Sequence, residues 1–77
     1  MTDTMLLDEV IAAKGMKYSF LAQALGLSNY GFYKKRYGLS EFTASEVAKL
    51  SQVLGLSRDM RDKIFLSQKL VALNLII

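Results

Sequence analysis

The most restrictive feature of this 77-residue chain is the spacing of its large apolar residues, which recur at intervals of three and four in a sequence without proline. That spacing gathers apolar side chains on one face of an α-helix, and no proline interrupts the repeat. Breaks that contain glycine or serine divide the chain into five such segments. We therefore predict an all-α domain of five helices, with a short apolar tail at the C-terminus.

The ends of the predicted helices carry capping residues. A side chain that accepts a hydrogen bond suits the start of a helix, and a glycine suits the position after its end. Thr43 and Glu46 form a capping box, in which each side chain satisfies the other residue's amide. The expected helices run from a cap at Asp3 or Thr4 to Lys14, from about Tyr18 to Leu25, from about Asn29 to Tyr37, from Thr43 to Gly55, and from Ser57 through Phe65.

Composition excludes several classes of function. The chain has no cysteine and no histidine, so disulfide scaffolds, thiolate metal sites and imidazole catalysis are ruled out. We therefore expect no enzyme activity, no cofactor and no metal. No apolar run reaches the length of a membrane span, and the N-terminus is acidic where a signal peptide is basic. A soluble cytoplasmic protein without a membrane partner is the expectation.

Charge is distributed unevenly along the sequence. The window 10–40 holds five cations and no Asp or Glu, whereas the rest of the chain holds five cations and all seven acids. A small domain polarised in this way is expected to turn one face toward a polyanion. The alternative is a solvated face on which the cations cluster by chance.

The segment 20–32 has what two short helices need to meet at a steep angle across a tight turn. The first helix needs a small residue at the crossing, the turn needs a residue that accepts positive φ, and both need apolar plugs into a shared core. Ser28 is placed to cap the second helix. This pattern predicts a helix-turn-helix, and its packing residues are Ala22, Leu25, Gly26, Leu27 and Phe32.

From about Leu6 to Phe65 the chain resembles the Cro and lambda-repressor family of helix-turn-helix regulators, the xenobiotic-response-element class. The resemblance rests on the segment LAQALGLS, on Gly38 after the third helix, and on a fourth helix of the type TxxEVAKLSQVLGLS. The pairs Phe42-Thr43 and Ile64-Phe65 are similar to those of small repressors of phages and mobile elements. The family usually has an apolar residue three positions after Phe32, where this chain has Lys35.

The resemblance implies a role for each residue of the third helix. The first exposed residues of that helix would meet base edges, and its flanks would meet phosphates. The base-reading candidates are Asn29, Tyr30, Tyr33 and Lys34, and the phosphate candidates are Tyr18, Ser28, Lys35, Arg36 and Tyr37. Lys34 and Arg36 are expected at the surface. The aromatic residues expected in the core are Phe20, Phe32, Phe42 and Phe65.

The last eight residues form a separate apolar segment. We expect a DNA-binding domain at 1–69 and a tail at 70–77 that either pairs two chains or folds back over its own core. The tail's expected dimer residues are Leu70, Val71, Leu73, Leu75 and Ile76. The leading hypothesis is a phage or prophage regulator that binds a two-fold DNA operator as a homodimer. The alternative is a protein-interaction module on the same fold, such as an antirepressor, an antitoxin or a polymerase-binding factor.

Overall fold

The computed structural model describes residues 2–66, and within them it contains five α-helices and no strand. Their order in the chain matches the five segments that the apolar spacing predicts. The helices are α1 (Thr4–Lys14), α2 (Tyr18–Ala24), α3 (Asn29–Arg36), α4 (Ala44–Leu54) and α5 (Arg58–Phe65). The predicted all-α fold of five helices is therefore confirmed. The tail residues from 70 onward lie outside the described part of the chain.

Four of the five helices begin at a side-chain cap. Asp3 caps α1, Ser28 caps α3 and Ser57 caps α5, each by accepting a hydrogen bond from a backbone amide of the first turn. The predicted capping box is present at the start of α4, where Thr43 and Glu46 satisfy each other's amides. Local sequence thus fixes where most of the helices start.

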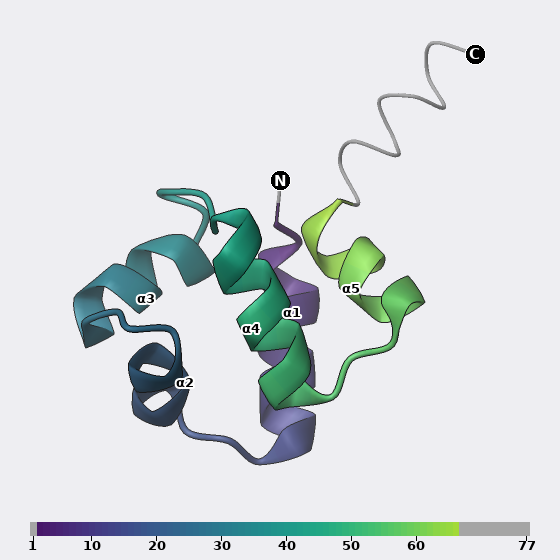
Figure 1. The fold of residues 1–77 in the computed structure, drawn as a ribbon, viewed down its shortest axis with the longest axis horizontal. Helices are drawn as coiled ribbons and strands as arrows, with labels where there is room; N and C mark the ends of the chain where they lie inside the picture. The colour runs from purple at the N-terminus through teal and green to yellow at the C-terminus, as the bar shows by residue number, and fades with distance from the viewer. Residues whose placement is uncertain (1, 67–77) are drawn as a thin grey trace, which may run out of the picture.

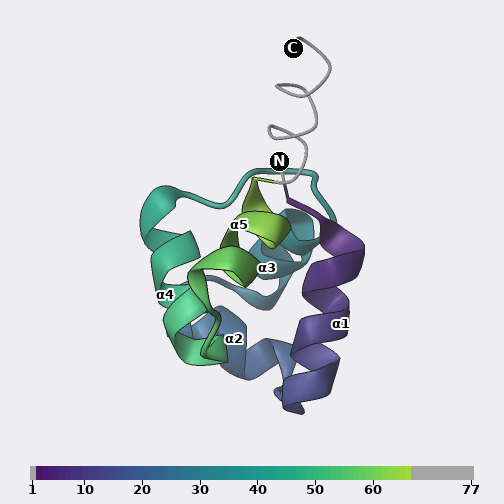
Figure 2. The same cartoon turned by 90° about the vertical axis from the view of Figure 1, so that its right-hand side faces the viewer.

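The helices surround one core (Figure 1). In that view α2 and α3 lie at the left, α1 and α4 in the middle and α5 at the right, and Figure 2 shows α1 and α4 on opposite sides of the bundle. The backbone amide of Asp3 donates to the carbonyl of Ile64, so the start of the described chain lies against α5. Five helices too short to be stable alone therefore hold one another through tertiary packing.

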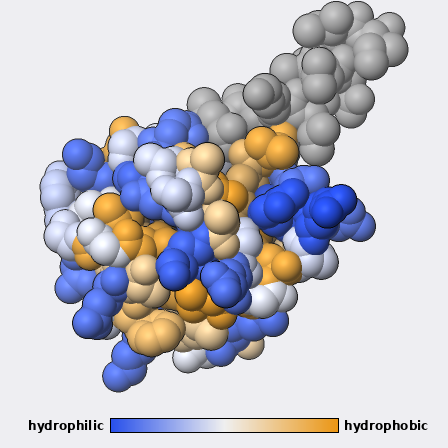
Figure 3. Space-filling view, in the orientation of Figure 1, coloured by the Kyte–Doolittle hydropathy of each residue, from blue (hydrophilic) through white to orange (hydrophobic). Residues whose placement is uncertain are grey.

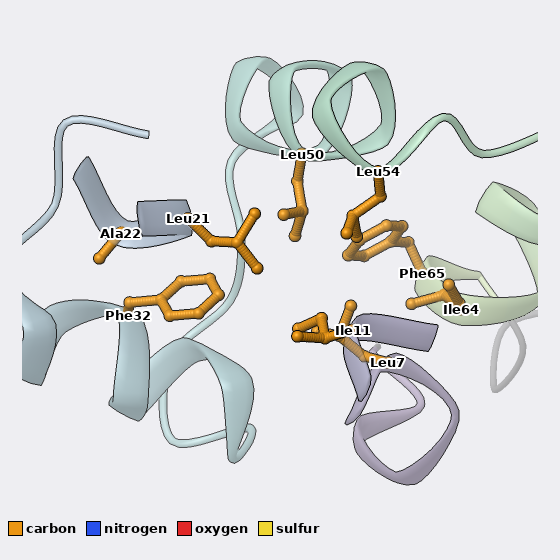
Figure 4. Close-up of a cluster of buried hydrophobic side chains, with 9 residues drawn as sticks. All are labelled: Leu7, Ile11, Leu21, Ala22, Phe32, Leu50, Leu54, Ile64 and Phe65. Carbon is orange, nitrogen blue, oxygen red and sulfur yellow. The ribbon is translucent and has the colours of Figure 1, made fainter. Parts of the chain in front are cut away.

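Buried side chains from all five helices meet in the middle of the bundle (Figure 4). Phe32 enters this cluster from α3, and Leu50 and Leu54 enter it from α4. Phe42 lies at the edge of the cluster, with its ring edge-on to those of Phe32 and Phe65. The buried residues of this core are Leu7, Ile11, Leu21, Ala22, Phe32, Leu50, Leu54, Ile64 and Phe65.

One expected core residue is on the surface. Phe20 leaves 54% of its side chain exposed, although its sequence position suggested burial. It lies on α2 next to Leu21 and Ala22, which are both buried, and a seven-residue helix turns only one narrow face inward. The expectation for Phe20 was therefore wrong, whereas those for Phe32 and Phe65 are confirmed. None of the helices in residues 2–66 is long and apolar enough to cross a membrane.

Candidate nucleic-acid interface

The corner between α2 and α3 has the geometry that the turn residues predict. Gly26 has φ of +72°, in the left-handed region that favours glycine. The amide of Leu27 donates to the carbonyl of Ala22 over 2.9 Å and closes the turn. Ala22 is buried at this corner, and Leu25 and Leu27 pack against the core. These contacts hold α3 at a fixed angle on α2.

The cap of α3 fixes where its exposed residues begin. The Ser28 hydroxyl accepts a hydrogen bond from the Gly31 amide at 3.0 Å. Asn29, the first residue of the helix, is exposed directly after this cap. Phe32 points from the opposite side of α3 into the core, as Figure 4 shows. The helix therefore has one anchored face and one face directed away from the domain.

Lys35 holds α3 against α4. Its ammonium donates to the Glu46 carboxylate, and both side chains are largely buried. Burial alone would raise the pKa of the Glu46 carboxyl, but hydrogen bonds from Lys35 and the Thr43 amide, together with the lysine's charge, lower that pKa below its ordinary value of 4.5. An ion pair thus stands where the family usually has an apolar contact. Lys35, which the resemblance suggests as a phosphate contact, is thus paired with Glu46 inside the domain.

Arg36 is the second basic residue that the structure moves inward. Only 8% of it is exposed, and its guanidinium donates to the Asp8 carboxylate of α1 at 3.1 Å. The same guanidinium lies 3.8 Å from the centre of the Tyr18 ring and 4.8 Å from that of Tyr37. A planar guanidinium that packs on two aromatic rings and pairs with a carboxylate is held firmly where little water reaches it. The expectation that Arg36 lies at the surface is therefore wrong.

Most of the outward surface of α3 is aromatic. Tyr30, Tyr33 and Tyr37 share one face and expose 68%, 44% and 54% of their side chains. Lys34, half-buried, has its ammonium 5.7 Å from the centre of the Tyr30 ring. Figure 3 shows the most strongly hydrophilic colour over α5 at the right, and a mixture of pale and blue side chains on the side where α3 lies. The structure therefore places all four base-reading candidates on or beside one outward face.

Two acidic residues that the sequence did not assign to the site complete it. Asp8 and Glu46 come from α1 and α4, and each neutralises one basic residue of α3. The capping box pointed to Glu46 as a cap but not as a partner of Lys35. No local pattern marks Asp8, because its partner lies 28 residues further along the chain. The charge window in the sequence therefore overstates the positive charge that α3 presents.

The fold and this corner define the chain as a helix-turn-helix DNA-binding domain. The family model for the Cro/C1-type HTH DNA-binding domain matches residues 6–59, which is more than half of the chain. The chain belongs to that family. No curated protein and no solved structure gives a significant match. Within residues 2–66, no three acidic side chains gather in a way that could hold a metal ion.

Proposed function

We propose that this protein is a sequence-specific regulator of transcription, of the phage or prophage Cro/repressor type, which occupies a two-fold operator in double-stranded DNA as a homodimer. The observation that carries the proposal is the outward face of α3. It starts at Asn29, which is exposed directly after the Ser28 cap. Three other residues of α3 hold the helix in place: Phe32 is buried in the core, Lys35 pairs with α4, and Arg36 pairs with α1. A rigid helix with its polar start free is suited to enter a major groove.

In this proposal Asn29, Tyr30, Tyr33 and Lys34 meet base edges, and the surrounding surface meets phosphates. Asn29 can bond adenine with both atoms of its amide, and Lys34 can donate to the acceptors of guanine. Tyr18, Ser28 and Tyr37 remain phosphate candidates, because each is exposed, Ser28 at the start of α3 and the two tyrosines beside Arg36 at its end. A regulator of this kind acts where the DNA is, in the cytoplasm of a bacterial or phage-infected cell.

Selection of bound duplexes from a random pool tests the proposal, followed by footprinting of the DNA upstream of the protein's own gene. Asn29→Ala should weaken binding to the selected duplex by about 5- to 150-fold, corresponding to about 1–3 kcal/mol for a bidentate base contact. The affinity of the Asn29→Ala variant for random duplex should not change. The matched control is Gln52→Ala, because Gln52 is also an exposed amide and lies in the last turn of α4, not on α2 or α3. A pool in which no duplex is enriched would overturn the proposal.

Dimer formation is the second part of the proposal, because one recognition helix covers too few base pairs for useful specificity. The described chain ends at Leu66, beside a groove of about 450 Å³ between α4 and α5 whose lining includes Phe42, Val47 and Phe65. Five large apolar residues follow between positions 70 and 76. We propose that this tail from one chain is buried in the groove of its partner. Sedimentation of the full chain and of a chain truncated after Gln68 tests this.

Two outcomes of that experiment are decisive. If the truncated chain is a folded monomer that keeps weak DNA binding, the tail joins two chains. If the full chain is monomeric at tens of micromolar, and truncation unfolds it, the tail covers its own core and the dimer proposal fails.

One observation favours a different function on the same fold. Two of the three cations of α3 are paired inside the domain, and its outward face carries three tyrosines, a residue type enriched at protein interfaces. A protein-interaction module, such as an antitoxin or antirepressor, would use this face against another protein. Failure of the duplex selection, together with a protein partner whose binding Tyr30→Ala abolishes, would support that alternative.

A further inference from the structure

The aromatic face of α3, which we define as Tyr30, Tyr33 and Tyr37, is a continuous row of side chains. The rings of Tyr30 and Tyr33 are nearly parallel, with 14° between their planes and 6.0 Å between their centres. The Tyr33 and Tyr37 rings are 4.7 Å apart. Positions 30, 33 and 37 recur at three and four residues, so they occupy one side of the helix.

One end of this row is fixed to the body of the domain. Tyr37 lies against the Arg36 guanidinium, which is itself buried beside Tyr18 and paired with Asp8. Each ring therefore has a neighbour, and the outermost, Tyr30, also lies near the Lys34 ammonium. Rings that are ordered before binding lose little conformational entropy when they meet a ligand.

The same arrangement limits how α3 can read DNA. Lys35 and Arg36 are paired with Glu46 and Asp8, so within the described residues Lys34 is the one cation of α3 outside an ion pair. The outward surface is thus poor in charged donors and rich in ring carbon. In the major groove the one apolar feature of the base edges is the C5-methyl group of thymine. Burying ring surface against methyl groups is favourable, whereas setting it against polar edges gains little.

We propose that Tyr30 and Tyr33 read thymine through its C5-methyl group, with Tyr37 as the positioning residue that holds the Tyr33 ring. The inference rests on the proposed function and specifies what the base-reading face recognises. It predicts that the operator half-site carries T·A pairs opposite these two rings. It also predicts that the rings, and not the phenolic hydroxyls, supply the discrimination.

The test uses the full chain and a duplex selected from a random pool. Each thymine in turn is replaced by deoxyuridine, which removes the methyl group and keeps the base pair. At the thymines opposite the rings, affinity should fall about fourfold for each methyl, the equivalent of about 0.8 kcal/mol for one buried carbon. Tyr30→Phe and Tyr33→Phe keep the rings, so they should keep the fourfold ratio between the affinities for the thymine and the deoxyuridine duplexes. Tyr30→Ala and Tyr33→Ala should bind the thymine and deoxyuridine duplexes equally.

Several results would overturn the inference while the proposed function stands. A selected duplex that tolerates deoxyuridine at every thymine is one of them. A loss with Tyr→Phe as large as that with Tyr→Ala is another, because the hydroxyls would then make the contact, to a phosphate or a polar base edge. Equal affinity for the single strand would show that the rings stack on unpaired bases. If no duplex is enriched at all, the proposed function fails and this inference fails with it.

Discussion

The guanidinium of Arg36 donates to the carboxylate of Asp8 at 3.1 Å and joins the last residue of α3 to the middle of α1. Together with the ion pair between Lys35 and Glu46, it fixes the C-terminal turn of the recognition helix to two different helices. The N-terminal turn remains free at the surface behind its Ser28 cap. Two basic residues that sequence alone assigns to DNA contact therefore hold α3 in place within the domain.

Removing Arg36 should destabilise the fold, because it leaves the Asp8 carboxylate without its partner. We expect Arg36→Ala to lower the free energy of unfolding by about 1–3 kcal/mol, a value below that for a fully buried pair because Asp8 is partly exposed and can be rehydrated. Urea unfolding measures this loss. Arg36→Lys should recover only part of it, since an ammonium cannot lie flat between two rings. The control, exposed Arg58→Ala, should change stability by less than about 0.5 kcal/mol.

The pair between Lys35 and Glu46 should make stability depend on pH. The pKa of Glu46 is lower in the folded chain than its ordinary value of 4.5, so folding favours the ionised carboxylate. Its contribution is complete above about pH 4.5 and is lost as the pH falls through the lower, folded-state pKa.

Glu46→Gln removes this contribution and keeps an acceptor for the capping box. At pH 7 the variant should be less stable than the parent by about 0.5–1.5 kcal/mol, and the difference should shrink as the pH falls toward 3. Unfolding curves at both pH values measure it. Glu41→Gln, at an exposed residue outside any ion pair in residues 2–66, is the control. A difference that stays constant with pH would show that the carboxylate is not stabilised by its charge.

The sequence predicts interactions between residues that are close together in the chain, and it misses those between residues that are far apart in it. The caps at Ser28 and Thr43, and the left-handed turn at Gly26, depend on residues within a few positions of one another, and each was predictable. The partners of Lys35 and Arg36 lie 11 and 28 residues away, and nothing in the local pattern reveals them. The sequence shows where the basic residues are, but it does not show whether a neighbouring helix supplies the opposite charge.

Phe20 and Phe32 offer a direct comparison of a surface and a core aromatic residue. Phe32→Ala should cost about 3–5 kcal/mol, because it empties the centre of a small core, and this loss would leave much of the protein unfolded. Phe20→Ala should cost less than about 1 kcal/mol, since more than half of its side chain is already in water. Thermal unfolding followed by circular dichroism separates the two. Equal losses would contradict the orientation of α2.

The turn at Gly26 should be sensitive to backbone conformation and not to crowding. A β-carbon at this position would meet no atom within 4 Å, so the cost of Gly26→Ala arises from its φ of +72° and should be about 1 kcal/mol. Gly26→Asn should cost less, because asparagine tolerates the left-handed region, and Gly26→Val should cost more. Denaturant unfolding gives the order of the three. Equal stability for all three variants would mean that the turn relaxes out of this conformation.

Salt dependence should reveal how many basic residues reach the DNA. If all five cations of the window 10–40 met phosphates, a dimer would neutralise about ten, and affinity would fall about 10⁵-fold between 50 and 200 mM salt. The ion pairs of Lys35 and Arg36 and the base-reading role of Lys34 leave two per chain, Lys14 and Lys17, so we expect about four phosphates and a loss of about 10²-fold. Lys17→Gln should then reduce the salt slope by about two per dimer, whereas Lys35→Gln should leave it unchanged. A reduced slope for Lys35→Gln would mean that its pair with Glu46 opens to meet the DNA.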